Sequence, residues 1–254
     1  MTSRINAFQS AMRQGERLVG TFVKTPSPIV AEVLGQTRLD CVCLDAEHAP
    51  FDRLALDQMI AHLRVADMPT LVRVPAAQDW LILNALDCGA TGVVIPHIRT
   101  AEEAAAAVKA AHFGPGGRGY AGSTRAAGYG TVAIPDHLAG SATRTTIVGQ
   151  IEDAEALGEV DAILAVEGMD ALFIGRIDLT ISLGATSAAA PEVVEAVEMI
   201  VRKGREAGRT IGMFTPTVDE AKAWADKGAS FFLLASEHAW IKAGANALAD
   251  GLRL

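Results

Sequence analysis

The sequence predicts a (β/α)8 barrel, an α/β fold in which eight parallel strands close into a ring. Eight short apolar runs alternate with segments of helical periodicity along the 254 residues. Most of these runs are continuous rather than alternating, which is typical of strands buried on both faces of a parallel sheet. Eight units of about 32 residues each fit a barrel of roughly 250 residues. An open doubly wound sheet is the alternative, disfavoured because no GxGxxG motif follows the first run.

The strands that we expect can be justified in chain order, because a glycine or a short polar turn comes before each apolar run. The runs are LVGTFV at 18–23, DCVCLD at 40–45, TLVRV at 70–74, GVVIPH at 92–97, IVGQIE at 147–152, ALFIG at 171–175, TIGMF at 210–214 and FFLLAS at 231–236. We find no linker and no shift in composition, so we expect residues 1–254 to form a single domain.

The helices between these runs carry start and stop signals. Thr100 with Glu103, and Thr217 with Glu220, fit capping boxes, in which each side chain satisfies a free backbone N–H. Helix ends are marked by glycines that come shortly before a strand, where a left-handed residue closes the helix. These glycines are Gly89, Gly208 and Gly228.

Composition excludes several classes of protein. The net charge of −8 argues against a nucleic-acid or membrane partner, since such binders need a basic surface. Three cysteines without a CxxC pair make no disulfide framework, and we assign Cys41 and Cys43 to a strand. The first residues lack an apolar signal core, and no run reaches the roughly 18 residues of a membrane span. We therefore expect a cytoplasmic protein.

Polar side chains follow most of the runs, at the strand ends where barrels carry their chemistry. Glu152 and Asp178 together could hold a hard divalent cation. An arginine such as Arg73 can stabilise an enolate, and a histidine beside an aspartate is a candidate general base. The residues at these ends are Lys24, 45–48, Arg73, 96–97, 150–153, 175–178, 215–216 and 236–237.

At these positions the sequence resembles the metal-dependent class II pyruvate aldolases of the hydroxyoxoheptanedioate and dehydrodeoxyglucarate aldolase type. The resemblance runs from Gly20 to about Gly184. It implies a barrel of the phosphoenolpyruvate/pyruvate superfamily, a homohexamer, and a bound Mg²⁺, Mn²⁺ or Co²⁺. Six strings carry it: LDAEH at 44–48, VRVP at 72–75, LDCGATGVVIPH at 86–97, GGRG at 116–119, QIED at 150–153 and GRIDLTISLG at 175–184.

The resemblance also implies roles for single residues. Glu152 and Asp178 match the metal ligands, and Gln150 and the backbone of Ile177 match pyruvate contacts. Together with Asp178 and Arg73 these form the expected substrate site.

In the same way, Arg73 matches the arginine that stabilises the enolate. His48, paired with Asp45, matches the general base. Asp87 matches an aspartate that raises the basicity of that base. Asp87, however, belongs to a helix end on the N-terminal face of its own barrel, so it either caps locally or serves the site of a neighbouring subunit.

Several residues depart from the family pattern or have two interpretations. Arg176 and Ile177 are bulkier than the proline and alanine that are common there, and Asp153 replaces a common threonine. Glu47 could orient Arg73 or His48, or have no chemical role. The glycine-rich stretch 114–130 is expected to be a functional loop or an assembly contact, with Arg118 contacting an anion or a second subunit. His97 is a candidate for lining the pocket; the remaining histidines are expected to be structural.

The function that we expect is a divalent-metal-dependent aldolase, joining the enolate of pyruvate or a close 2-oxo acid to an aldehyde, or cleaving the 4-hydroxy-2-oxo acid product. Three alternatives stay open. One is a class I aldolase with Lys24 as Schiff base. Another is a related lyase acting on a thioester or a longer 2-oxo acid. The third is a non-catalytic metabolite-binding barrel, disfavoured because it has no need of a base.

Overall fold

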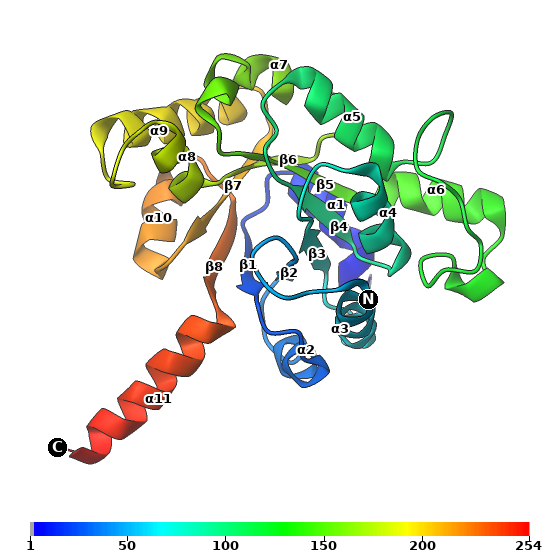
Figure 1. Ribbon diagram of the computed structural model, residues 1–254, viewed down its shortest axis with the longest axis horizontal. Coiled ribbons are helices and arrows are strands. Elements are labelled where there is room, and N and C mark those ends of the chain that lie inside the picture. The colour runs from blue at the N-terminus through cyan, green and yellow to red at the C-terminus, as the bar shows by residue number, and fades with distance from the viewer. Residues whose placement is uncertain (1–2, 254) are drawn as a thin grey trace.

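A closed barrel of eight parallel strands forms the centre of the molecule, as a computed structural model that describes residues 3–253 shows (Figure 1). The strands follow one another around the ring in chain order, and β1 pairs with β8 to close it. They are β1 Leu18–Val23, β2 Cys41–Asp45, β3 Thr70–Arg73, β4 Gly92–Ile95, β5 Thr146–Ile151, β6 Ala171–Ile174, β7 Thr210–Thr215 and β8 Phe231–Ser236. The predicted α/β barrel is confirmed, with every strand within two residues of its expected ends.

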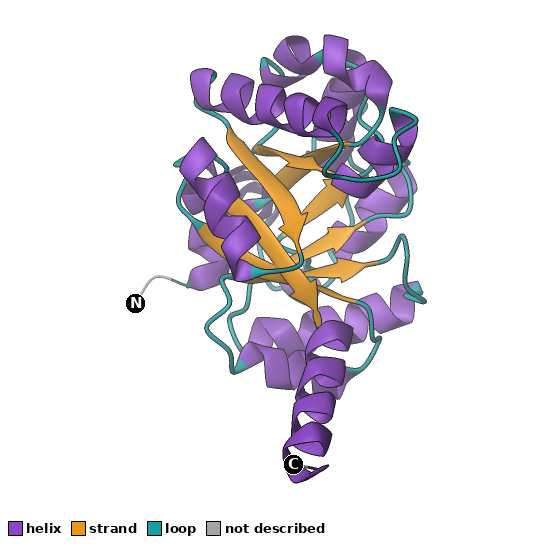
Figure 2. Ribbon diagram, turned by 90° about the vertical axis from the view of Figure 1, so that its left-hand side faces the viewer, coloured by secondary structure: helices purple, strands orange, loops and turns teal. Residues whose placement is uncertain are grey.

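Helices surround the strands on the outside of the barrel (Figure 2). Helices such as α9 pack an apolar face on the ring, where Val193, Val197 and Ile200 are buried. The helices are α1 Arg4–Arg13, α2 Pro28–Gly35, α3 Arg53–Val65, α4 Asp79–Asp87, α5 Ala101–Ala111, α6 Ile134–Arg144, α7 Val160–Leu164, α8 Arg176–Ser182, α9 Pro191–Glu206, α10 Val218–Lys227 and α11 Glu237–Arg253, with 3₁₀ turns at Gly128–Gly130 and Ala154–Gly158.

The expected helix starts and ends are present, but within the described residues neither capping box has its return bond, since the Glu220 carboxylate pairs with Arg176. Thr100 Oγ1 accepts a hydrogen bond from the Glu103 N–H, as a capping box requires. The carboxylate of Glu103, however, accepts from the backbone and the guanidinium of Arg99 rather than from the N–H of Thr100. Gly228 ends α10 at a φ of 116°, a left-handed conformation that costs glycine little.

The N-terminal helix closes one end of the barrel. Phe8 and Met12 of α1 are buried against the side chains that fill the barrel interior, among them Phe231. The Thr210 hydroxyl donates to the Met12 carbonyl and so ties α1 to the start of β7. Access to the barrel interior is therefore left to the opposite end, where the strands have their carboxyl termini. Cys41 lies in the same interior cluster, as expected for a strand residue.

The last helix, α11, projects away from the barrel (Figures 1 and 2). The helix contacts the barrel at β8 and β1, next to the residues where the helix begins. Beyond that point its large apolar side chains are exposed, Leu248 by 80% and Leu252 by 90%. Within the part of the chain that the structure describes, no helix is both long and apolar enough to cross a membrane.

Candidate active site

A cavity of about 330 Å³ opens at the carboxyl ends of the strands. Phe22, Phe173 and Phe214 form an apolar wall, so a small ligand there is partly shielded from water. The structure brings seven of the side chains singled out from the sequence to this one cavity, which is where a barrel is expected to carry its chemistry. They are Lys24, His48, Arg73, Gln150, Arg176, Ile177 and Asp178.

Arg73, at the end of β3, is fixed by two carboxylates. Its Nε and one terminal nitrogen donate to Asp45 Oδ1 at 3.0 and 2.8 Å, and its Nε lies 3.3 Å from Glu47 Oε2. The guanidinium also stacks on the Phe22 ring, 4.6 Å from its centroid. A cation held in this way is already oriented before any anionic ligand arrives, which suits it to stabilise developing negative charge.

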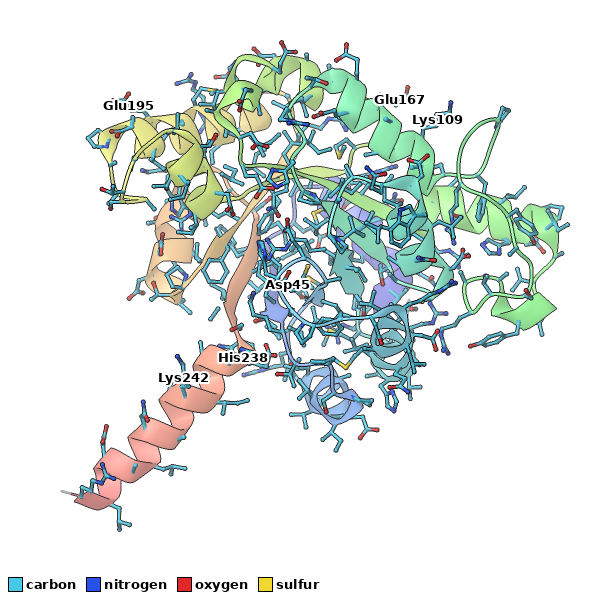
Figure 3. All side chains as sticks on the ribbon, in the orientation of Figure 1. Asp45, Lys109, Glu167, Glu195, His238 and Lys242 are labelled. Carbon is cyan, nitrogen blue, oxygen red and sulfur yellow. The ribbon has the colours of Figure 1, made fainter. Side chains whose placement is uncertain are left out.

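Asp45 ends β2 and is fully buried inside the barrel (Figure 3). Burial raises the pKa of its carboxyl group, but the charge of Arg73 and hydrogen bonds from Lys24 and the His48 backbone outweigh it and hold the pKa below its ordinary value. Lys24 Nζ lies 2.5 Å from Asp45 Oδ2. Asp45 is therefore an anion that anchors two cations of the site.

His48 reaches the cavity from the turn after β2, but its contact with Asp45 differs from the expected pair. Asp45 Oδ1 accepts from the backbone N–H of His48 at 3.1 Å. The imidazole is half exposed, and its Nε2 lies 3.7 Å from Glu47 Oε2. The physical reason is that both oxygens of Asp45 already bind cations, which leaves Glu47 as the carboxylate beside the ring.

Glu47 thus lies between Arg73 and His48, the two residues that it could orient. Burial raises the pKa of its carboxyl group above the ordinary value, although the charge of Arg73 opposes this effect. Its Oε2 is buried without a hydrogen bond from the described residues. Its contact with Arg73 is therefore ionic, and the carboxylate has capacity for one more donor.

Glu152 follows β5 and is 2% exposed. Its Oε1 accepts from the backbone N–H of His97 at 2.9 Å, and its Oε2 accepts from the Gln150 amide. Gly175 faces this carboxylate so closely that a Cβ there would lie 2.5 Å from Oε2. Gly175 is the residue immediately before α8, so the absence of a side chain lets the start of α8 approach Glu152.

Asp178 lies in the first turn of α8 and is exposed at the cavity. Across the described residues, no cluster of three or more His, Cys, Asp or Glu side chains converges as a complete metal site. The available donors are the carboxylates of Glu152 and Asp178 together with Gln150 Oε1, which is buried and has no partner in the described chain. An oxygen-only set, with water completing the coordination, fits Mg²⁺ or Mn²⁺.

His97 was expected to be a candidate for lining the cavity, and the structure gives it another place. Its backbone has a φ of 56°, and its ring Nδ1 lies 3.0 Å from Asp153 Oδ2. Burial acts against protonation, but the bond to Asp153 and the charge of Glu152 prevail, and the pKa of His97 is raised. Its contribution to the site is the N–H that it donates to Glu152, which only the backbone conformation reveals.

The amide of Lys24 is also tied to the site by a residue that the sequence did not single out for this role. Glu237, at the start of α11, accepts from the backbone N–H groups of Lys24 and Thr25 at 2.8 and 2.6 Å. The position of Glu237 directly after the last strand indicated a residue at the site, but the sequence did not show that its carboxylate would bind the backbone of Lys24 and Thr25. The Lys24 ammonium is engaged with Asp45, whereas a Schiff-base lysine needs a free amine.

Arg176 and Ile177 both line the cavity, but the charge of Arg176 is paired whereas the side chain of Ile177 is exposed. One terminal nitrogen of Arg176 lies 2.5 Å from Glu220 Oε1 and the other donates to the Phe214 carbonyl at 3.1 Å. Most of its charge is therefore already paired. Ile177 is 62% exposed and adds an apolar side chain to the cavity wall.

Asp87 lies apart from this cavity. It ends α4 just before β4, at the N-terminal end of the barrel, and is 8% exposed. Its carboxylate binds Arg118 of the glycine-rich loop, which is buried as well and stacks on the Phe113 ring. Within the described chain Asp87 therefore fixes a loop; a role in the site of a neighbouring subunit stays a prediction.

Comparison with known proteins places this site in a family. The profile of the HpcH/HpaI aldolase/citrate lyase family matches residues 18–242. The chain is 35% identical over 247 residues to a 5-keto-4-deoxy-D-glucarate aldolase of Salmonella paratyphi C, covering 96% of each chain. The structure of an HpcH/HpaI aldolase/citrate lyase family protein from Burkholderia cenocepacia J2315 superimposes with a TM-score of 0.92 at 31% identity, covering 98% of this chain and all of that one.

The similarity of fold extends to more distant proteins. A structure described as the citrate lyase beta subunit of M. tuberculosis, complexed with oxaloacetate and magnesium, has a TM-score of 0.57 at 17% identity and covers 89% of this chain and 93% of that one. At that identity it shows a shared barrel. The match at 35% identity over nearly the full length carries more: this chain belongs to the HpcH/HpaI aldolase/citrate lyase family.

Proposed function

We propose that the protein is a divalent-metal-dependent pyruvate aldolase. It joins the enolate of pyruvate, or of a close 2-oxo acid, to an aldehyde, or cleaves the resulting 4-hydroxy-2-oxo acid. The observation that carries the proposal is the pairing at one cavity of a fixed cation, Arg73, with the oxygen donors Asp178 and Gln150. Glu152 is buried next to this cavity, where its carboxylate accepts from the Gln150 amide. A 2-oxo acid needs both kinds of group, because its carboxylate and its developing enolate are anionic.

The proposed chemistry divides between the cation and the residues of this chain. Glu152 and Asp178 would hold a divalent cation, which when bound supplies Lewis-acid polarisation of the 2-oxo group. Arg73, held by Asp45, stabilises the negative charge that develops as the methyl proton leaves. His48 takes that proton at its ring, which is exposed to the cavity. Phe22, Phe173 and Phe214 limit the access of water to the carbanion.

The name of the Salmonella relative supports a choice of substrate class. That protein is a 5-keto-4-deoxy-D-glucarate aldolase, so its substrate is an acyclic sugar diacid. We propose that this chain cleaves a substrate of the same class. Because Arg176 is paired with Glu220 and Lys24 with Asp45, the exposed side chain of Ile177 remains to contact the aldehyde portion.

We also propose that the chain assembles into a homo-oligomer, a hexamer by the resemblance given above. Support comes from α11, which leaves the barrel and exposes Ile241, Leu248 and Leu252. Such apolar side chains are typical of an interface rather than of a free surface. Light scattering after size exclusion should give six times the chain mass, and a monomeric mass would contradict this proposal.

The test of the activity needs no knowledge of the aldehyde. Pyruvate is incubated with the protein in D₂O, and loss of the methyl proton signal is followed with Mg²⁺ or Mn²⁺ and with EDTA. Exchange that requires the cation would support the proposal. Exchange that persists in EDTA, with covalent trapping by borohydride, would indicate Lys24 and a Schiff base. Absence of exchange would contradict the proposal and favour a thioester lyase, another 2-oxo acid, or a binding protein.

A further inference from the structure

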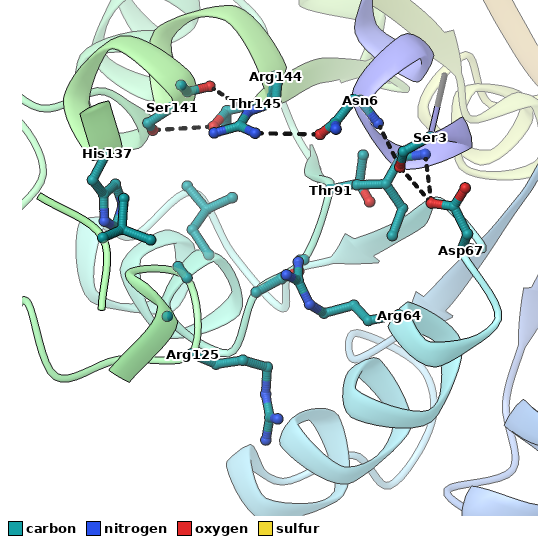
Figure 4. A pocket seen from close by; sticks show the side chains of 18 of the residues that line it. Ser3, Asn6, Arg64, Asp67, Thr91, Arg125, His137, Ser141, Arg144 and Thr145 are labelled. Carbon is teal, nitrogen blue, oxygen red and sulfur yellow. Dashed lines mark hydrogen bonds between the residues drawn. The ribbon is translucent and has the colours of Figure 1, made fainter. Parts of the chain in front are cut away.

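A second cavity, of about 450 Å³, lies at the N-terminal end of the barrel (Figure 4). It is bounded by α1, α3, the loop 114–130 and α6, and we call it the basal cavity. Four arginines line it, one from α3, two from the loop and one from α6: Arg64, Arg118, Arg125 and Arg144. Such a gathering is unexpected in a chain whose net charge is −8.

Two of these arginines have no carboxylate partner among residues 3–253. Arg64 donates to the Gly89 carbonyl at 3.2 Å. Arg144 donates to the Gly140 carbonyl at 3.0 Å and to Asn6 Oδ1 at 3.3 Å. Both are exposed at the mouth of the cavity, where an incoming anion would meet them.

The other charges of the basal cavity are accounted for. Arg118 binds Asp87 and Arg125 binds Asp57. Asp67, the one carboxylate that lines the cavity among the described residues, accepts hydrogen bonds from the N-terminal segment, its Oδ2 from the Arg4 N–H at 2.7 Å. The unpaired charge is therefore positive.

Arg64 and Arg125 are held close together. A Cβ on Gly89 would lie 3.4 Å from Arg64 Cδ and 3.2 Å from Arg125 Cδ, so both stems pass the same glycine. Partial desolvation lowers the pKa of Arg64, although the residue is exposed at the mouth, and the charges of Arg125 and Arg144 lower it further. Like charges packed in this way repel each other, and an anion between them relieves that repulsion.

The inner wall of the basal cavity carries polar atoms that lack partners. Arg118 has a side chain only 2% exposed, and its Nε has no acceptor in the described chain. His137 is 6% exposed, and its Nδ1 likewise has no partner there. Buried polar atoms are almost always satisfied, so these two nitrogens indicate an occupant that the chain itself does not provide.

We propose that the basal cavity binds a small oxyanion carrying two or more negative charges, either a phosphate group or a dicarboxylate. Guanidinium groups match the oxygens of both with paired hydrogen bonds. This site is separate from the catalytic cavity, because it lies at the start of the strands rather than at their carboxyl ends. It goes beyond the proposed function and does not depend on it.

Calorimetry with two probes, inorganic phosphate and succinate, tests the proposal and distinguishes the two ligand chemistries. We expect wild-type protein to bind at least one of them with a Kd below about 1 mM. The double variant Arg64→Gln/Arg144→Gln should weaken that binding at least about tenfold, since two charge-assisted contacts are lost. Arg64→Lys keeps the positive charge but not the planar guanidinium with its paired donors, so it should give an intermediate loss of affinity. Unfolding curves establish that each variant is folded.

A matched control removes two positive charges elsewhere. Arg202→Gln/Lys222→Gln alters exposed side chains of α9 and α10 and should bind as wild type does. Equal binding by the Arg64/Arg144 variant and this control would overturn the proposal. So would loss of binding in Arg73→Ala, because the ion would then occupy the catalytic cavity. Failure of both probes to bind wild-type protein would overturn it as well.

Discussion

Gly175 offers the sharpest test of the catalytic cavity, because the substitution Gly175→Ala adds a single methyl group beside Glu152. The new Cβ would lie 2.5 Å from Glu152 Oε2 and 2.8 Å from Glu152 Cβ. Ordinary contact begins at 3.4 Å, so the carboxylate must move by about 0.9 Å. Gly175 is not in the left-handed region, with φ at −81°, so alanine adds no backbone strain of that kind.

The size of the effect follows from this displacement. Misplacing a catalytic group by about 1 Å can cost about 100-fold in rate, so we expect pyruvate methyl exchange to fall about 100-fold. Crowding of this kind also destabilises a packed site by about 1–3 kcal/mol, which the whole barrel can tolerate. Binding of Mn²⁺, measured by calorimetry, should weaken because Glu152, a proposed ligand, is displaced.

Gly158→Ala provides the matched control, since a Cβ at Gly158 would meet nothing within 4 Å. That variant should keep its exchange rate and its affinity for Mn²⁺. If folded Gly175→Ala exchanges the methyl protons of pyruvate within about twofold of wild type, the position of Glu152 does not govern the reaction, and the ligand assignment fails.

Three further predictions address the same cavity. Glu152→Gln and Asp178→Asn should each abolish binding of Mn²⁺; full retention by calorimetry would refute their assignment as ligands. Arg73→Ala should leave that binding intact yet remove methyl exchange, and near-normal turnover would exclude its role at the enolate. Asp45→Asn should lower the free energy of unfolding at pH 7 by about 3 kcal/mol, because it removes the carboxylate that hydrogen-bonds to the buried Arg73 and leaves only the longer contact with Glu47. Folding lowers the pKa of Asp45, so the stability that its charge contributes is present above the ordinary pKa and is lost as the pH falls through the lower, folded value. In denaturation curves, the difference in unfolding free energy between wild type and variant should therefore narrow at strongly acidic pH. A constant difference would contradict this.

The strands could be predicted from the sequence because of their burial. Residues such as Val42 and Leu44 are fully buried, as are residues on the other face of the same strand, and only a continuous apolar run satisfies both faces. The position of the cavity followed from the same fact, since parallel strands in a barrel all end at one rim.

What escaped prediction depends on packing partners far apart in the chain. Nothing in the spacing of Phe8 and Met12 shows that α1 closes the barrel rather than covering its side. The positive φ of His97 accompanies a hydrogen bond from its N–H to Glu152, which lies 55 residues further along the chain. Local sequence does not indicate such a contact. The periodicity of α11 indicates a helix but not the direction in which it leaves the barrel.

The relation between Asp45 and His48 shows how a correct motif can carry an unexpected geometry. Spacing alone suggests that the carboxylate polarises the imidazole. In the structure Asp45 Oδ1 receives the His48 N–H and two guanidinium nitrogens, and Oδ2 receives Lys24. Asp45 therefore fixes the turn that carries His48 and the guanidinium beside it, and acts on the reaction through the placement of both. The carboxylate beside the ring is Glu47, whose Oε2 lies 3.7 Å from His48 Nε2.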